Sequence, residues 1–140
     1  GPDYKITGPL KMKYAIVPHR GKWDKAAIAT KSDCWNEPLL CSYHPSVKLE
    51  SRSLVNLKNS GYQVSAANMK DGKIILRLFN AEGDKKQHNI TFDIPLSSIE
   101  EVDLNGRIID RKTIKTRAGK SEISISIPRF GIKTFALNLN

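Results

Sequence analysis

Apolar and other side chains alternate along several short stretches in the second half of the chain, and turn-forming residues separate these stretches. The clearest alternation covers residues 73–80, where one set of positions is Ile74, Leu76 and Leu78 and the other is Ile75, Arg77 and Phe79. A period of two places successive side chains on opposite faces of an extended strand. This part of the sequence therefore predicts β-strands.

Seven such stretches are present, over residues 53–57, 62–69, 73–80, 88–94, 98–104, 122–127 and 132–139. The pairs Asp71-Gly72 and Asn105-Gly106 stand between neighbouring stretches, and such pairs favour the positive φ angles of hairpin turns. Seven or eight short strands joined by tight turns favour a two-sheet sandwich over a parallel α/β fold. We therefore predict an all-β fold, an antiparallel two-sheet sandwich with one short helix near the N-terminus.

The first forty residues follow a different pattern. Residues 13–17 predict a strand that ends at Pro18, because proline cannot donate to a strand ladder. Residues 22–34 have the spacing of a short amphipathic helix, which Pro38 brings to an end. We expect residues 1–12 to be a tag remnant or mobile lead-in, and residues 13–140 to form a single β-sandwich domain.

The composition fits this reading. A chain of 140 residues has the size of one domain and can bury a core without a metal or disulfides. Its longest apolar stretches are only a few residues, whereas a membrane-spanning helix needs roughly 20. We therefore expect no membrane partner, and the sequence leaves the compartment undetermined.

The net charge of +9 raises the question of a nucleic-acid partner. The densest basic run, residues 107–120, contains no aromatic residue that could stack on a base. A solvated hairpin explains this run, and we expect no nucleic-acid partner.

Residues that could carry chemistry are scattered. The three histidines and two cysteines do not have the spacing of a zinc site, and the acidic residues fall mainly in turns and at strand ends. We expect no catalytic residue, no metal ligand and no cofactor in this chain. Cys34 and Cys41 are expected to be buried thiols, although a disulfide between them stays open.

Several ordered motifs resemble a known family. They are the run Tyr14-Ala15-Ile16-Val17-Pro18-His19-Arg20-Gly21-Lys22-Trp23, the exit Asn36-Glu37-Pro38-Leu39, the strand pair at residues 64–70 and 75–80, and the ending at residues 132–137. In this order they are similar to the C-terminal region of glycoside hydrolase family 38 α-mannosidases. The resemblance covers nearly the whole chain from about residue 13.

This resemblance implies a parent enzyme that hydrolyses terminal α-linked mannose with retention of configuration and uses zinc. The family's catalytic and zinc-binding groups lie upstream of the region that the chain resembles, so none is carried over. The implied partner is the upstream catalytic domain of the same chain, and mannose-containing glycans are reached through it. His19, Arg20 and Arg77 are our candidates for the domain interface or the substrate groove.

An alternative function is a non-catalytic carbohydrate-binding module. Such modules commonly stack sugar rings on aromatic side chains that share one face, and the aromatic residues here are scattered. Trp23 and Trp35 fall on or beside the predicted helix, and Phe79, Phe92 and Phe135 are expected in the core.

Overall fold

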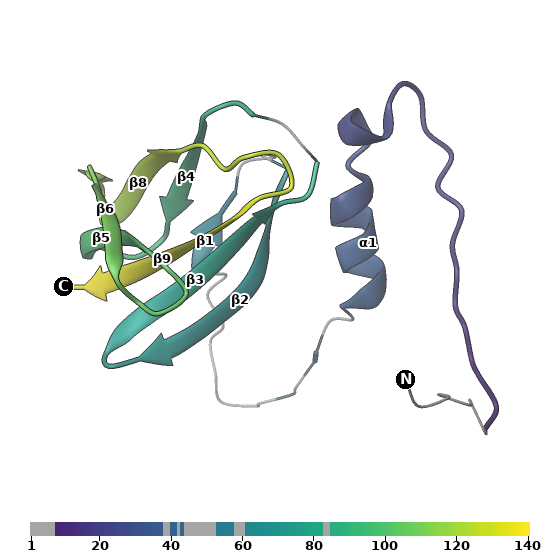
Figure 1. The fold of residues 1–140 in the computed structure, drawn as a ribbon, viewed down its shortest axis with the longest axis horizontal. Helices are drawn as coiled ribbons and strands as arrows, with labels where there is room; N and C mark the ends of the chain where they lie inside the picture. The colour runs from purple at the N-terminus through teal and green to yellow at the C-terminus, as the bar shows by residue number, and fades with distance from the viewer. Residues whose placement is uncertain (1–7, 38–39, 42, 44–52, 58–60, 83–84) are drawn as a thin grey trace.

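A computed structural model describes residues 8–37, 40–41, 43, 53–57, 61–82 and 85–140. Within these residues the chain forms two antiparallel sheets around a shared core, as expected, with a helix and an extended N-terminal segment to one side (Figure 1). We call residues 8–37 the N-terminal arm. Figure 1 shows that α1 of this arm stands between the extended segment and the two sheets.

The elements follow the chain in a simple order: a 3-10 helix (Trp23–Lys25), α1 (Ile28–Asn36), β1 (Val55–Asn56), β2 (Tyr62–Lys70), β3 (Lys73–Asn80), β4 (His88–Phe92), β5 (Leu96–Val102), β6 (Ile108–Lys112), β7 (Lys115–Arg117), β8 (Lys120–Ile125) and β9 (Ile132–Leu139). One sheet has the strand order β1-β4-β8-β7, and the other has the order β2-β3-β9-β5-β6. All the described strand pairs are antiparallel.

The turns follow from local sequence. Asp71 and Gly72 have φ angles of 51° and 74°, which gives the predicted tight hairpin between β2 and β3. Beyond β5, the Asp103 carboxylate accepts hydrogen bonds from the backbone N–H groups of Asn105 and Arg107, each at 2.8 Å. These contacts fix the Asn105-Gly106 turn and end β5 at Val102, two residues before the predicted end.

The core lies between the sheets. Its buried members are Tyr62, Leu76, Leu78, Ile90, Phe92, Leu96, Ile99, Ile123, Ile125, Ile127, Phe135 and Leu137. Two polar side chains close one end of it: the Tyr62 hydroxyl accepts the N–H of Ile127 at 3.1 Å, and the Asn80 amide donates to the Ile127 carbonyl at 3.0 Å. Both main-chain groups of Ile127 are thereby satisfied inside the protein.

The N-terminal arm contacts the sandwich through few groups. The rings of Trp23 and Phe130 stack with centroids 5.9 Å apart, and the Gln63 amide donates to the Asp33 carboxylate at 2.7 Å. None of the described arm residues is fully buried. The arm therefore adds little to the core.

Two expectations for the arm are wrong. Residues 13–17 form no strand, because no described strand pairs with them, and the Tyr14 side chain is 85% exposed. The helix predicted over residues 22–34 is also not continuous. Ala27 has a φ angle of 51°, in the left-handed region, so the chain forms a 3-10 turn, breaks, and starts α1 at Ile28. The helix ends at Asn36, two residues beyond the predicted end and before Pro38.

Other corrections concern single residues and one basic run. Cys34 and Cys41 are exposed free thiols rather than buried ones. His88 is half-buried, with its ring edge-on to Tyr62 at a centroid distance of 5.0 Å. Phe79 is only half-buried and lies outside the core. Of the expected lead-in at residues 1–12, residues 1–7 lie outside the described residues.

The basic run at residues 107–120 is not a single hairpin. Its first half is β6, an edge strand of the five-stranded sheet, and its second half is β7, an edge strand of the four-stranded sheet. Only Thr113 and Ile114 separate the two strands, so the chain crosses here from one sheet to the other. The run is nonetheless mostly exposed, as expected.

Candidate docking face on the five-stranded sheet

The outer face of the five-stranded sheet carries more apolar surface than a solvated face usually does. Strand register places on this docking face Ile75, Arg77 and Phe79 from β3, Ile132, Thr134 and Ala136 from β9, Glu100 and Val102 from β5, and Ile108 and Arg111 from β6. In an antiparallel sheet with one solvent-exposed face, apolar side chains normally point to the core and polar side chains point to solvent. A strand such as β3, apolar on both faces, is instead typical of a sheet that is covered on both sides.

The middle of the docking face is already closed to water. Thr134, Ala136 and Val102 are buried although they point away from the core. They are short, and the longer side chains of neighbouring strands stand around them. Around this centre Ile108 and Ile132 are each at least half exposed, which leaves apolar surface without cover in the described structure.

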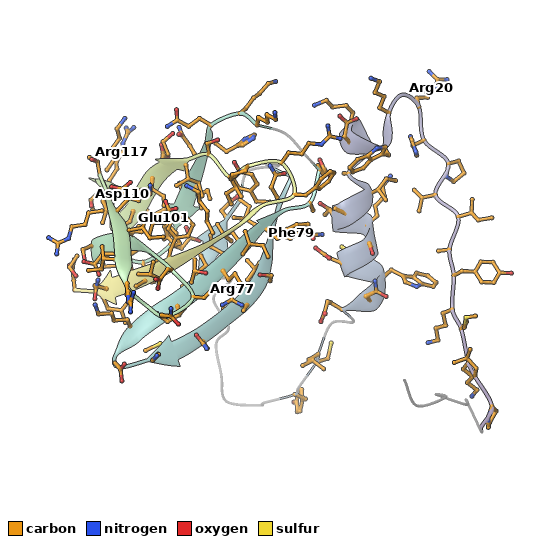
Figure 2. All side chains as sticks on the ribbon, in the orientation of Figure 1. Arg20, Arg77, Phe79, Glu101, Asp110 and Arg117 are labelled. Atoms are coloured by element: carbon orange, nitrogen blue, oxygen red, sulfur yellow. The ribbon has the colours of Figure 1, made fainter. Side chains whose placement is uncertain are left out.

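Arg77, labelled in Figure 2, lies directly across from Thr134 in the register of β3 and β9. Its Nε–H donates to the Thr134 hydroxyl at 3.4 Å, and it forms no ion pair with any described residue. A guanidinium has five N–H donors in a planar fork. The remaining donors of Arg77 can bind a carboxylate or carbonyl supplied from outside the sheet.

Glu100 is the acidic group of the docking face. It is buried, and its carboxylate lies 3.5 Å from Lys73 Nζ and 3.4 Å from Arg111 Nε. Two cations around one carboxylate, together with Arg77, leave the face positive. Such a surface suits an acidic partner.

The three residues proposed from sequence lie in different places. Arg77 is on β3, whereas His19 and Arg20 are exposed in the loop that precedes the 3-10 helix. Figure 2 shows Arg20 far from Arg77. The structure does not bring the three together. Sequence reasoning missed Glu100, Val102 and the rest of the docking face, although the apolar residues on both faces of residues 73–80 were a signal for it.

A cluster of charges fills the rim of the core beside this sheet. The Glu101 carboxylate lies 2.8 Å from Lys112 Nζ and 3.0 Å from Lys133 Nζ, and Lys112 also contacts Asp110 at 2.6 Å. Burial opposes ionisation of Glu101, but the hydrogen bonds from Lys112 and Lys133 outweigh it and lower the pKa of that carboxyl. Burial acts in the same opposing way on Lys112, where the bonds to Asp110 and Glu101 raise the pKa.

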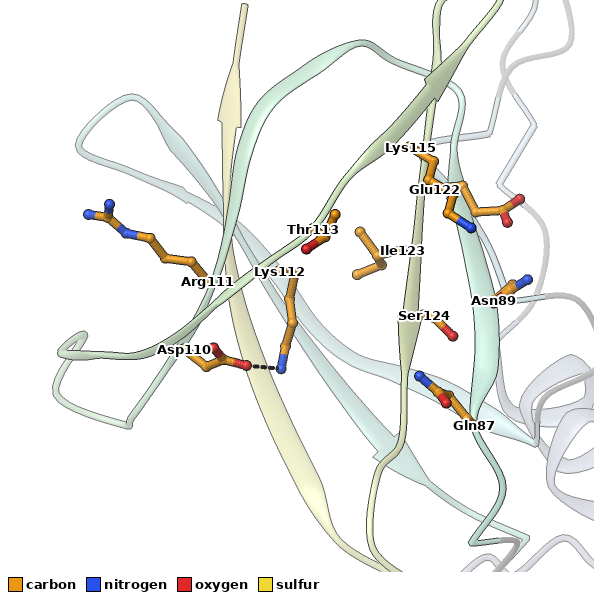
Figure 3. A pocket seen from close by; sticks show the side chains of 10 residues that line it. All are labelled: Gln87, Asn89, Asp110, Arg111, Lys112, Thr113, Lys115, Glu122, Ile123 and Ser124. Atoms are coloured by element: carbon orange, nitrogen blue, oxygen red, sulfur yellow. Dashed lines mark hydrogen bonds and ion pairs between the residues drawn. The ribbon is translucent and has the colours of Figure 1, made fainter.

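A polar groove of about 390 Å³ lies at the edge of the four-stranded sheet (Figure 3). Its lining residues include Gln87 just before β4, Asn89 from β4, Glu122 and Ser124 from β8, and residues 110–113. Among its described lining residues there is no aromatic side chain, so the groove offers hydrogen bonds to a sugar but no ring on which to stack one.

The described residues contain no group of three or more His, Cys, Asp or Glu side chains arranged to hold a metal ion. No helix in the described part of the chain has the length and apolar character needed to cross a membrane.

Comparison with models of protein families matches residues 62–135 to "Glycosyl hydrolases family 38 C-terminal beta sandwich domain". The match is just over half of the chain, and it runs from the start of β2 into β9, so it includes strands of both sheets. Searches of curated proteins and of solved structures found no match. The matched description is the family that the sequence motifs resemble, and its β-sandwich is the observed fold. The chain therefore belongs to the family of glycosyl hydrolase family 38 C-terminal β-sandwich domains.

Proposed function

We propose that this chain is the C-terminal accessory domain of a retaining, zinc-dependent α-mannosidase. In this proposal residues 13–140 act as one unit, which packs on the catalytic domain of the same polypeptide and helps to wall the groove where terminal α-linked mannose is hydrolysed. By itself the chain is inactive. Family membership supports the type of domain, and the docking face is the structural observation that carries the packing role.

The docking face has the features of a surface within a larger assembly. It combines exposed apolar side chains with Arg77, whose guanidinium has no ion-pair partner among the described residues. Domain interfaces of one chain are often of this mixed kind, more polar than the interfaces of obligate dimers. Packing of an acidic surface on this face covers Ile108 and Ile132 and gives Arg77 a carboxylate.

The catalytic chemistry is assigned to the parent enzyme. In the enzymes that the sequence resembles, zinc binds hydroxyl groups of the sugar, but the described residues offer no ligand cluster for it. We therefore assign no catalytic step to this domain. His19 and Arg20 stay candidates for a contact with the catalytic domain, because both are exposed in the arm.

The first experiment compares this chain with a longer chain that includes its natural upstream sequence. Both are assayed on an aryl α-mannoside with zinc present. We expect turnover by the longer chain alone. Turnover by the pure 140-residue chain would contradict an accessory role. If neither chain turns over the substrate, the proposal of a mannosidase loses its support.

A second experiment tests the docking face within the longer chain. We expect Arg77→Ala to lower activity about tenfold, because truncation of an interface arginine commonly costs more than about 1 kcal/mol. The matched control is Arg117→Ala, in the exposed edge strand β7 of the other sheet. Equal effects of the two substitutions on activity would argue against docking through this face.

The alternative function, a carbohydrate-binding module, depends on the polar groove of Figure 3. Calorimetric titration of the 140-residue chain with mannose oligomers separates the two functions. Saturable heat that disappears in the double variant Gln87→Ala, Asn89→Ala supports a module. We expect no such heat, because the described lining of the groove has no aromatic side chain.

A further inference from the structure

Residues 10–17 form an extended segment that lies against solvent. Its side chains at every second position are apolar and largely exposed: Leu10, Met12, Tyr14 and Ile16, the last at 84%. Pro9 and Pro18 bracket the segment. An alternating stretch of this length, bounded by prolines, is typical of a single β-strand.

The described structure gives this segment no hydrogen-bonded neighbour strand. An isolated strand in water buries no apolar surface and is not stable by itself. Such a segment becomes ordered when it adds to the open edge of a sheet, where main-chain hydrogen bonds bind it and pockets accept alternate side chains.

We infer that residues 10–17 are a β-strand that adds to the open edge of a sheet in the preceding part of the same polypeptide. The inference rests on the proposed function, since it takes the chain to be one domain of a longer enzyme. The partner strand carries acidic side chains near Lys11 and Lys13. Apolar pockets beside it receive Met12 and Tyr14.

The sandwich described here does not supply this edge. Figure 1 shows α1 standing between the segment and the two sheets, so the segment does not reach β2, the nine-residue edge strand on that side. The sandwich core is also complete without the segment, because its buried residues all come from position 62 onward.

A second copy of this chain fits less well than a separate acidic partner. The β2 strand contains no acidic residue and ends in Lys70, while the segment carries Lys11 and Lys13. Each copy has a net charge of +9. Pairing between two copies therefore places like charges side by side, which opposes association.

A crevice beside the segment indicates where the partner's side chains enter. It has a volume of about 690 Å³ and is lined by Met12, Lys13, Tyr14, Trp35 and Asn36. Trp35 is 57% exposed, and α1 has no buried residue. A partner that fills this crevice covers one side of the helix as well as the segment.

Hydrogen exchange of the backbone amides at residues 10–17 tests the inference directly. In the 140-residue chain we expect exchange at the rate of an unstructured peptide. In the longer chain with its natural upstream sequence, we expect at least a hundredfold slower exchange. Fast exchange in both chains overturns the inference, as does protection in the short chain together with a dimeric mass by light scattering.

A matched pair of substitutions supplies the second readout. Ile16→Asp puts a charge into the segment, and Leu104→Asp puts one at an equally exposed apolar position in the turn after β5. In the short chain neither is expected to shift the melting temperature. In the longer chain Ile16→Asp should abolish the amide protection and Leu104→Asp should keep it, and loss in both variants or in neither overturns the inference.

The two proposals fail in different ways. If the longer chain protects the amides of residues 10–17 but hydrolyses no mannoside, the added strand is supported and the mannosidase function is refuted. If the longer chain is active but leaves these amides unprotected, the mannosidase function is supported and the added strand is refuted.

Discussion

The sandwich and the N-terminal arm both contain alternating apolar residues, but they differ in what happens to them. In the sandwich, β3 and β9 lie between other strands and face a second sheet, so Leu76 and Leu137 are fully buried. In the arm, Tyr14 and Ile16 have the same periodicity and stay almost fully exposed. An alternating pattern thus defines a face, and burial depends on a partner for that face.

The largest expected effect belongs to the core. Phe135→Ala removes a fully buried ring from β9, and we expect a loss of about 3–5 kcal/mol in the free energy of unfolding. Tyr14→Ala in the arm should change it by less than about 0.5 kcal/mol. Urea unfolding of the two variants measures both values, and similar losses would remove the distinction between the two regions.

The charged rim of the core should give an intermediate effect. Glu101→Gln leaves Lys112 and Lys133 without their shared carboxylate, which we expect to cost about 2 kcal/mol at neutral pH. The control is Asp110→Asn, at a more exposed partner of Lys112, where solvent screens the ion pair and we expect a smaller loss. If Asp110→Asn costs more stability than Glu101→Gln, the stabilising contact of Lys112 is the one with Asp110 rather than the one with Glu101.

The same residue predicts a pH dependence. Because the folded protein lowers the pKa of Glu101, its contribution is complete above the ordinary value of 4.5 and is lost as pH falls through the lowered value. Below pH 4.5 the gap in stability between the native chain and Glu101→Gln should therefore narrow. Chemical unfolding at pH 7 and at steps below pH 4.5 measures this gap, and a constant gap would argue against an ionised Glu101.

The smallest effect is expected where the two regions touch. Trp23→Ala removes the stacking on Phe130, and we expect the unfolding free energy of the sandwich to fall by less than about 1 kcal/mol. Limited proteolysis should nevertheless cut the arm several times faster. Trp35→Ala, which loses no such ring contact, should match the native chain in both measurements.

Much of the sandwich was predictable because its signals are local. Alternation located β2, β3 and β9 to within a residue, and Asp71-Gly72 located the hairpin between the first two. The strands β6 and β7 were missed as separate strands. Their sequence is polar and basic, since an edge strand has few buried positions, and periodicity is therefore weak there.

The arm was harder to predict because its structure depends on more than local pattern. Residues 22–34 have helical spacing, yet the positive φ angle of Ala27 divides them. Alanine rarely adopts such an angle, so the residue type does not predict this break. Residues 13–17 have strand spacing, yet a strand also needs a neighbour. Here the pattern predicts the conformation that the segment can adopt, and the described residues do not supply its partner.

The candidate site was predictable only in part. Arg77 was a candidate through the family resemblance, and strand register places it on the docking face. Glu100 could not be selected in this way, because its contact with Lys73 joins β5 to β3 across β9. Only the strand order brings these residues together.

The position of β9 has a consequence for how the protein is made. This strand lies in the middle of the five-stranded sheet, between β3 and β5, although it is the last strand of the described chain. During synthesis the two halves of that sheet therefore have no link until residues 132–139 have left the ribosome. A product that stops before Ile132 keeps its earlier strands but leaves them apart, exposed to proteases and aggregation.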